Sequence, residues 1–232
     1  MSTLSTIMVL LSADDFLSIG AITALASLYF GLGVPFGFLP EPSTPVSGLR
    51  TILVLGGASS VGAAAVQLLH IAGGYNILAT SSSKHFDNIK SLGASDVFDY
   101  KSASVVDEIR KVAPNGINAI FDAVNSVPLN TSFLTLFEGA ETKILASLTT
   151  GVDVKPEDVP EGVQHIVTTM ANLFKMPNGI AKTMEALSKL AEQGKYKVPI
   201  EVKKVGNGLE SLDEGLKAMM KGVSGQKLVV SL

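Results

Sequence analysis

The sequence predicts an α/β fold with a doubly wound parallel sheet, and three observations carry that prediction. Its apolar runs are continuous rather than alternating, which is typical of strands buried on both faces. From Thr51 onward, strand-like and helix-like segments alternate at the spacing of βαβ units. With 47% hydrophobic and 17% charged residues in a chain of 232, there is enough apolar material for one substantial core.

The expected elements follow from hydrophobic periodicity and from turn residues. Strands are expected over 52–55, 75–80, 96–100, 117–124, 142–147 and 163–169, and helices over 60–72, 84–92, 105–112, 128–137 and 181–193. Gly73–Gly74 and Gly93 are expected to end the first two helices. The acidic segment 151–162 is expected to be a loop. After Pro199 we expect a helix over 209–220 and a last strand over 227–231.

Composition excludes several classes of function. A net charge of −3 supplies no basic surface, so nucleic acid is not an expected partner. The chain has no cysteine, which excludes disulfides, thiolate zinc sites and a cysteine nucleophile. No two of His70, His85 and His165 stand at metal-ligand spacing, so no metal site is expected.

The uncharged stretch from Phe16 to Pro40 raises the question of a membrane span. Glycines and a proline between Gly31 and Gly37 interrupt it, leaving an apolar helix of roughly 14 residues, which is too short to cross a bilayer. We therefore expect a buried helix in a cytoplasmic protein, with a membrane anchor over Phe16–Leu39 as the alternative.

The stretch LVLGGASSVGAAAVQLL, residues 53–69, is a strand, a glycine turn and a helix. After Gly56, the residues Gly57, Ser59 and Gly62 occupy the three positions of GxGxxG, with serine in the place of the middle glycine. Glycines there permit a tight turn and bring backbone N–H groups against a pyrophosphate. The motif alone is equally consistent with an ordinary tight turn. The βα units that follow it favour a Rossmann-type nucleotide fold.

The end of the second strand indicates which dinucleotide is bound. Folds specific for NAD usually place an acid there on the ribose 2′-hydroxyl. Here the sequence is ATSSSKHF, residues 79–86, with serines and a lysine and no acid, which favours the 2′-phosphate of NADP. The alternative is a helix start with Ser82 or Ser83 as the N-cap. Residues 122–125 and 146–149 either line the nicotinamide half of the cofactor or are simply strand ends.

Three stretches together carry a family resemblance: GGASSVG at 56–62, SLGA with VFDY at 91–94 and 97–100, and VSGQKLVV at 223–230. With them, the sequence resembles the medium-chain dehydrogenase/reductases over about residues 14–232. The similarity is to the zinc-independent branch of quinone oxidoreductases and fungal trans-enoyl reductases.

That resemblance implies an NADP(H) site with assigned residues, but it names no proton donor and leaves the catalytic residues unknown. It places the pyrophosphate at the glycine turn, the 2′-phosphate after the second and third strands, and the nicotinamide near the fifth strand and the tail. The implied residues are, in that order, Ala58, Ser59, Ser60 and Val61; Ser82, Lys84 and Tyr100; and Leu148, Val223 and Ser224. The glycines of the turn, Gly56, Gly57 and Gly62, complete the expected cofactor-binding residues. It also identifies residues 19–30 as the helix between domains, beside the cofactor.

Family members begin with a GroES-like domain, which we expect this chain to lack. Residues 1–40 would then be an N-terminal segment with the interdomain-type helix, 41–198 the NADP-binding domain, and 199–232 a C-terminal α/β segment left over from the missing catalytic domain. The implied activity is hydride transfer from NADPH to the activated C=C bond of a small enone, quinone or enoyl thioester. The alternative is a truncated, non-catalytic module that binds NADPH or a partner. A homo-oligomer or a partner protein is the expected cover for the surface that the missing domain would leave.

Overall fold

The computed structural model describes residues 8–10, 19–42, 46–148 and 154–231. Its larger sheet has six parallel strands: β2 (Thr51–Leu55), β3 (Asn76–Ser81), β4 (Asp96–Asp99), β5 (Ala119–Asp122), β6 (Ile144–Leu148) and β7 (Gln164–Thr168). The strands lie in the order β4-β3-β2-β5-β6-β7. From β2 the chain builds the sheet outward to β4 on one side, and from β5 it builds outward to β7 on the other, as in doubly wound nucleotide-binding folds. The predicted fold class is confirmed.

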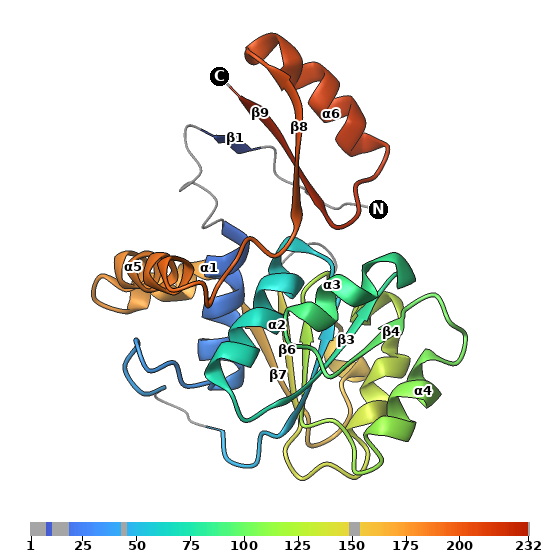
Figure 1. Cartoon of the computed structure of the whole chain (residues 1–232). Helices are drawn as coiled ribbons and strands as arrows, with labels where there is room; N and C mark the ends of the chain where they lie inside the picture. The colour runs from blue at the N-terminus through green and yellow to red at the C-terminus, as the bar shows by residue number, and fades with distance from the viewer. Residues whose placement is uncertain (1–7, 11–18, 43–45, 149–153, 232) are drawn as a thin grey trace.

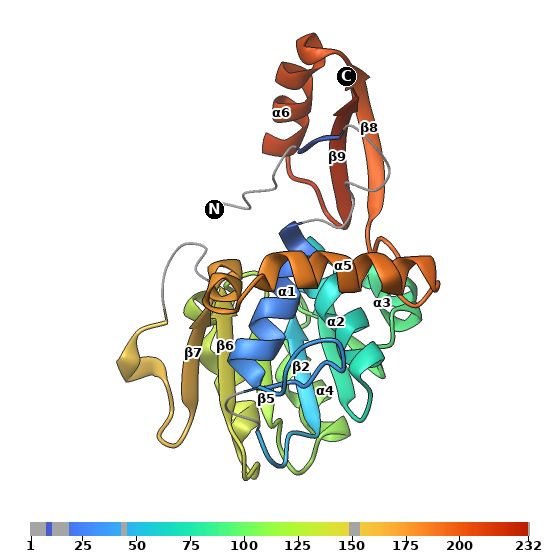
Figure 2. The same cartoon turned by 90° about the vertical axis from the view of Figure 1, so that its left-hand side faces the viewer.

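Helices cover both faces of this sheet (Figures 1 and 2). One face carries α1 (Ile19–Ala26), α2 (Ser60–Ala72), α3 (Phe86–Ser91) and α5 (Gly179–Glu192), and the other carries α4 (Val105–Val112). Strand β2 shows why a continuous apolar run is needed. Ile52 and Val54 pack into the first core, and Leu53 and Leu55 into the second.

The predicted helix over 128–137 is wrong in type. The chain forms two 3₁₀ segments there, η4 (Val127–Leu129) and η5 (Thr131–Phe137). Asn130 lies between them with φ −149° and ψ 88°, outside the helical region, and its side chain accepts the Ser132 N–H. The predicted helix over 84–92 likewise begins as a 3₁₀ turn, η3 (Ser83–His85), before α3. The other predicted strands and helices are present, with differences at their ends.

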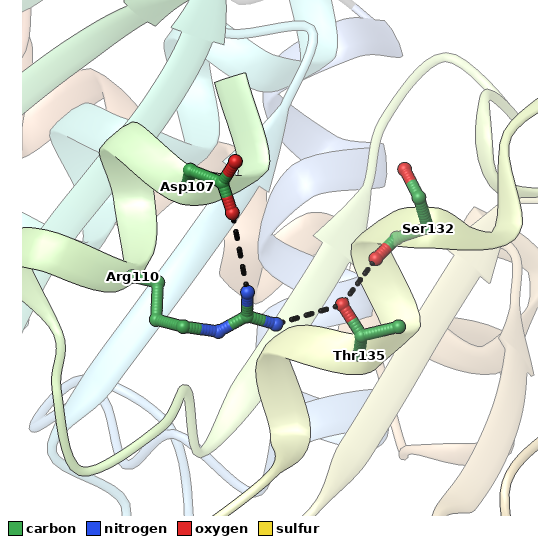
Figure 3. A network of polar contacts seen from close by, with 4 residues as sticks. All are labelled: Asp107, Arg110, Ser132 and Thr135. Atoms are coloured by element: carbon green, nitrogen blue, oxygen red, sulfur yellow. Dashed lines mark hydrogen bonds and ion pairs between the residues drawn. The ribbon is translucent and has the colours of Figure 1, made fainter. Parts of the chain in front are cut away.

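A small polar network joins α4 to η5 (Figure 3). The guanidinium of Arg110 donates to Thr135 Oγ1 at 3.1 Å and pairs with Asp107 at 3.4 Å. Thr135 in turn donates to the Ser132 carbonyl at 2.8 Å. These groups are exposed, so the network adds little to stability, but it sets the position of a 3₁₀ segment against its neighbouring helix.

A second sheet lies beyond the six-stranded one and holds the tail unit: β8 (Glu201–Asn207), η8 (Leu209–Ser211), α6 (Leu212–Met220) and β9 (Gln226–Ser231). Both figures show this unit standing apart from the main sheet, at the top of the view. Its third strand, β1 (Met8–Leu10), pairs in parallel with β9 and was not predicted. The C-terminal α/β segment of the predicted fold class is therefore present.

The described part of the uncharged segment begins with a largely buried helix over 19–31 and continues as a loop to residue 40. Helix α1 continues into a π turn, η2 (Ser27–Gly31), and most of its side chains lie in the first core. The Thr168 hydroxyl donates to Ser27 Oγ at 2.7 Å, which ties the π turn to β7. Within the described ranges, no helix has the length and apolarity that a bilayer crossing needs. Residues 16–18 of the proposed anchor lie outside them.

Candidate functional site

The glycine turn after β2 is held against the end of β3. Gly56 has a φ of +77°, a conformation that residues with a side chain rarely adopt. Its N–H donates to Thr80 Oγ1 at 3.1 Å, and the Gly57 N–H donates to the Thr80 carbonyl at 2.8 Å. The turn is thus held in place by two hydrogen bonds to Thr80 on the neighbouring strand.

Two glycines allow close packing around this turn, because Gly62 lets helix α2 approach it and Gly57 lets the turn lie against the end of β3. A Cβ on Gly62 would overlap the carbonyl oxygen of Gly56, and a Cβ on Gly57 would lie 3.0 Å from the Ala79 Cβ. Helix α1 also comes close, because a Cβ on Gly20 would overlap Ser60 Oγ. The helix that the resemblance placed beside the cofactor therefore packs at the first residue of α2.

Ser59, in the place of the middle glycine, is the N-cap of α2. Its hydroxyl oxygen accepts the Gly62 N–H at 3.0 Å, and its carbonyl accepts the Ala63 N–H at 2.9 Å. The hydroxyl proton remains for an outside acceptor. The backbone N–H groups of Ala58, Ser60 and Val61 have no hydrogen-bond partner among the described residues. These donors lie at the N-terminal end of α2, the positive end of the helix dipole, where an anion is favoured.

The predicted 2′-phosphate residues lie on neighbouring strand ends. Ser82 is the residue before η3 and, although in the N-cap position, makes no capping hydrogen bond. Lys84 is exposed in η3. Tyr100 follows β4, is 53% exposed, and its N–H donates to the Ser81 carbonyl at 3.2 Å. The structure therefore brings these three residues together at the carboxyl ends of β3 and β4.

The end of β5 is a structural turn built on a buried carboxylate. Asp122 is fully buried and accepts the Val127 N–H at 2.7 Å and the Val124 N–H at 3.2 Å. Val124 stands directly over Gly56, whose Cβ would overlap it. Asp122 therefore shapes the wall of the glycine turn rather than facing a ligand.

At the end of β6, Leu148 is buried and its side chain belongs to the first core. The hydroxyl of the preceding residue, Ser147, lies 2.8 Å from Nε2 of His165, which stands on β7. Both side chains are at least partly buried.

Val223 and Ser224 lie elsewhere, beside η3. They line a cleft of about 820 Å³ between α3 and the tail unit, together with Lys84 and His85. The Ser224 hydroxyl lies 3.0 Å from Nε2 of His85. The structure thus groups these two residues with the predicted 2′-phosphate site, whereas the resemblance had placed them on the nicotinamide side with Leu148.

Sequence reasoning missed His85 and Thr80 as parts of this site. Burial and the nearby Lys84 ammonium lower the pKa of His85. The sequence signal for Thr80 is its place as a polar residue at the end of an apolar strand. In the structure it is buried, with 2% of its surface exposed. Nothing in the sequence indicates the contact between His85 and Ser224, because a loop of the tail must return to η3 to make it.

Comparison with known proteins places the chain in a family. The model of the zinc-binding dehydrogenase family matches residues 60–190. The dehydrogenase azaJ of Aspergillus niger is 33% identical over 210 residues, which are 88% of this chain and 58% of that protein. The trans-enoyl reductase himH of Aspergillus japonicus is 29% identical over 219 residues, 93% of this chain and 61% of that protein. The chain thus spans less than two thirds of these relatives.

Solved structures agree in fold. The CurK enoyl reductase superposes with a TM-score of 0.69 at 19% identity, over 94% of this chain and 61% of that one. CurA of Vibrio vulnificus, solved in complex with NADPH, gives 0.67 at 18% identity, over 92% and 62%. The chain has no cysteine, and its described residues contain no cluster of three potential metal ligands. The chain belongs to the medium-chain dehydrogenase/reductases, in the zinc-independent branch that resembles enoyl reductases.

Proposed function

We propose that this chain binds NADP(H) at the glycine turn and belongs to an oxidoreductase that reduces activated C=C bonds. The observation that carries the proposal is the turn itself. Among the described residues, the N–H groups of Ala58, Ser60 and Val61 have no hydrogen-bond partner, and they lie at the start of α2 beside Gly62, which lets the helix approach the turn. A pyrophosphate is the ligand that such a donor set suits.

The residue types after β3 support NADP over NAD. From Ser81 to His85 there is no carboxylate to repel a 2′-phosphate. The Ser82 hydroxyl has no partner among the described side chains, and Lys84 is exposed with no ion pair there. Lysine to phosphate is a charge-assisted contact, so these groups would hold the 2′-phosphate directly.

The proposed substrate is a small enone, quinone or enoyl thioester, in keeping with the relatives whose names include trans-enoyl reductase. Bound NADPH supplies a hydride for an electron-poor carbon. The residues of this chain would orient the cofactor through the glycine turn and the Ser82 and Lys84 side chains. We assign no proton donor.

A binding titration tests the cofactor. NADPH should bind more tightly than NADH, and Lys84→Ala should weaken NADPH binding by about tenfold or more, since a charged hydrogen bond contributes about 1.5–3 kcal/mol. NADH binding should be unchanged in this variant. Lys182→Ala, on an exposed residue of α5, is the matched control. Failure to bind either dinucleotide, or a preference for NADH, would overturn the proposal.

Turnover is a separate measurement. NADPH consumption should be followed with a panel of enones, quinones and enoyl thioesters. Consumption that depends on one of these substrates supports the reductase. Tight NADPH binding without consumption would instead favour the alternative of a non-catalytic NADPH-binding module.

A further inference from the structure

His85 is held between the candidate cofactor site and the tail unit. It is the last residue of η3, and its N–H donates to the Ser82 carbonyl at 3.0 Å, so its backbone follows that of Ser82 and Lys84. Its ring lies 3.0 Å from the Ser224 hydroxyl through Nε2. Gly225 follows with a φ of +67°, and a Cβ there would overlap the imidazole. The ring is thus fixed by a loop that only glycine permits.

The charged side chains that line the cleft beside this ring are mainly cationic. The tail loop presents a hydroxyl and bare backbone to it, and α3 presents the Asn88 amide, which donates to the Pro199 carbonyl at 3.1 Å. The single carboxylate lining the cleft, that of Glu201, accepts a hydrogen bond from Gln226 at 2.7 Å. The charged residues lining the cleft are Lys84, Lys197, Lys203 and Glu201.

In the protein without ligand, this environment favours the neutral imidazole. Burial and the charge of Lys84 lower the pKa of His85 below its ordinary value of 6.5. Lys84 directly precedes His85 in η3, and both residues line the same cleft. A phosphate dianion held by Lys84 would act on the same ring with the opposite sign and a larger charge. Binding of the phosphate would therefore favour the imidazolium form of His85 over the neutral imidazole.

We propose that His85 is a specificity-determining residue of the 2′-phosphate site, and that NADPH binding is coupled to uptake of one proton from solvent by its imidazole ring. The inference rests on the proposed function. The neutral ring gains the proton, and no other bond changes. NADH, which lacks the 2′-phosphate, gains nothing from the imidazolium and takes up no proton. The His85 ring then adds to the preference for NADPH over NADH that Ser82 and Lys84 supply.

Titration calorimetry in buffers of different protonation enthalpy measures the uptake directly. Between about pH 6 and pH 8, the wild-type chain should take up part of a proton with NADPH and none with NADH. NADPH affinity should fall as the pH rises through this window, by at most about tenfold per pH unit. The second ionisation of the phosphate, near pH 6, changes affinity in the opposite direction, so it cannot produce this trend.

His85→Asn, which keeps a hydrogen-bonding side chain without the charge, should abolish the uptake and weaken NADPH but not NADH. His70→Asn, on an exposed residue of α2, is the matched control and should behave as wild type. A second measurement needs no variant. NMR titration of the three histidines should show one whose pKa rises when NADPH is added.

The inference and the proposed function fail differently. NADPH binding with no proton uptake, or with the same uptake in His85→Asn, would overturn the role of His85 and leave the cofactor site standing. Absence of NADPH binding in the wild-type chain would overturn both.

Discussion

The Gln67 side chain holds both polar groups of the Lys197 backbone. Its Nε2 donates to the Lys197 carbonyl at 2.9 Å, and the Lys197 N–H donates to its Oε1 at 3.0 Å. Gln67 lies in α2 and is 5% exposed, whereas Lys197 lies in the segment that leads from α5 to the tail unit. One buried amide thus anchors the tail unit to the helix that begins at the glycine turn.

Replacing Gln67 by leucine should cost about 1–3 kcal/mol of unfolding free energy, because two backbone groups of Lys197 lose their partner. Urea unfolding measures this. Gln193→Leu, at the exposed end of α5, should change stability by less than about 0.5 kcal/mol. Equal losses in the two variants would show that the amide does not anchor the linker.

Gly62→Ala should be destabilising by about 1–3 kcal/mol and should weaken NADPH binding, because its methyl group overlaps the Gly56 carbonyl and pushes α2 away from the turn. Gly37→Ala is the control, since its Cβ would meet nothing within 4 Å. Thermal unfolding and a cofactor titration are the measurements. Unchanged NADPH affinity in Gly62→Ala would be inconsistent with the pyrophosphate position.

Stability should fall at alkaline pH, in part through Tyr196. Burial raises the pKa of its phenol above the ordinary value of 10.0, and the side chain is 4% exposed. The unfolded chain loses this proton near pH 10 while the folded chain keeps it, so the stabilisation is complete below pH 10 and is lost as the pH rises above it.

Tyr196→Phe should therefore show a shallower loss of stability above about pH 10, by at most about 1.4 kcal/mol per pH unit. Part of the loss of stability with pH should remain in Tyr196→Phe, because burial also raises the pKa values of Tyr29 and Tyr75. Tyr100→Phe, on an exposed residue, is the comparison. Identical alkaline profiles for Tyr196→Phe and wild type would refute the assignment.

Thr168 and Ser27 should be coupled in a double-mutant cycle. Both are fully buried, and the Thr168 hydroxyl also approaches the Ser147 carbonyl at 3.2 Å. Thr168→Val should cost about 1–3 kcal/mol, and less when Ser27→Ala is already present, since the serine is then no longer left unpaired. Thr131→Val, on an exposed residue, is the control. Additive losses would show that the π turn is not held by this bond.

The parts of the fold that were predicted correctly are those with local signals. Helix α2 has the predicted bounds because Ser59 caps its start and Gly73, with φ +75°, ends it, and both act within a few residues. The strands β2, β3 and β5 were predicted because burial on both faces demands continuous apolar residues. The segment 128–137 was wrongly predicted to be one helix because its apolar spacing fits a helix, whereas Asn130 interrupts the helical backbone.

In the candidate site, too, the features with local sequence signals could be predicted and the contacts between distant segments could not. The glycine turn and the residues after β3 follow from sequence, because each lies on one continuous stretch. The placement of Ser224 beside His85, and the pairing of Gln67 with Lys197, join segments that are far apart in the chain. Gln67 carries one hint, as a polar residue within an apolar helix. Its partner cannot be predicted from sequence, because it is the backbone N–H and carbonyl of Lys197, and almost every residue carries the same two groups.

The pairing of β1 with β9 also sets an order of events during synthesis. Met8–Leu10 leaves the ribosome more than 200 residues before its partner Val229–Ser231. The six-stranded sheet, from Thr51 to Thr168, is complete well before then. We therefore expect the six-stranded sheet to fold before β1 pairs with β9, so that the three-stranded sheet of the tail unit is completed after it.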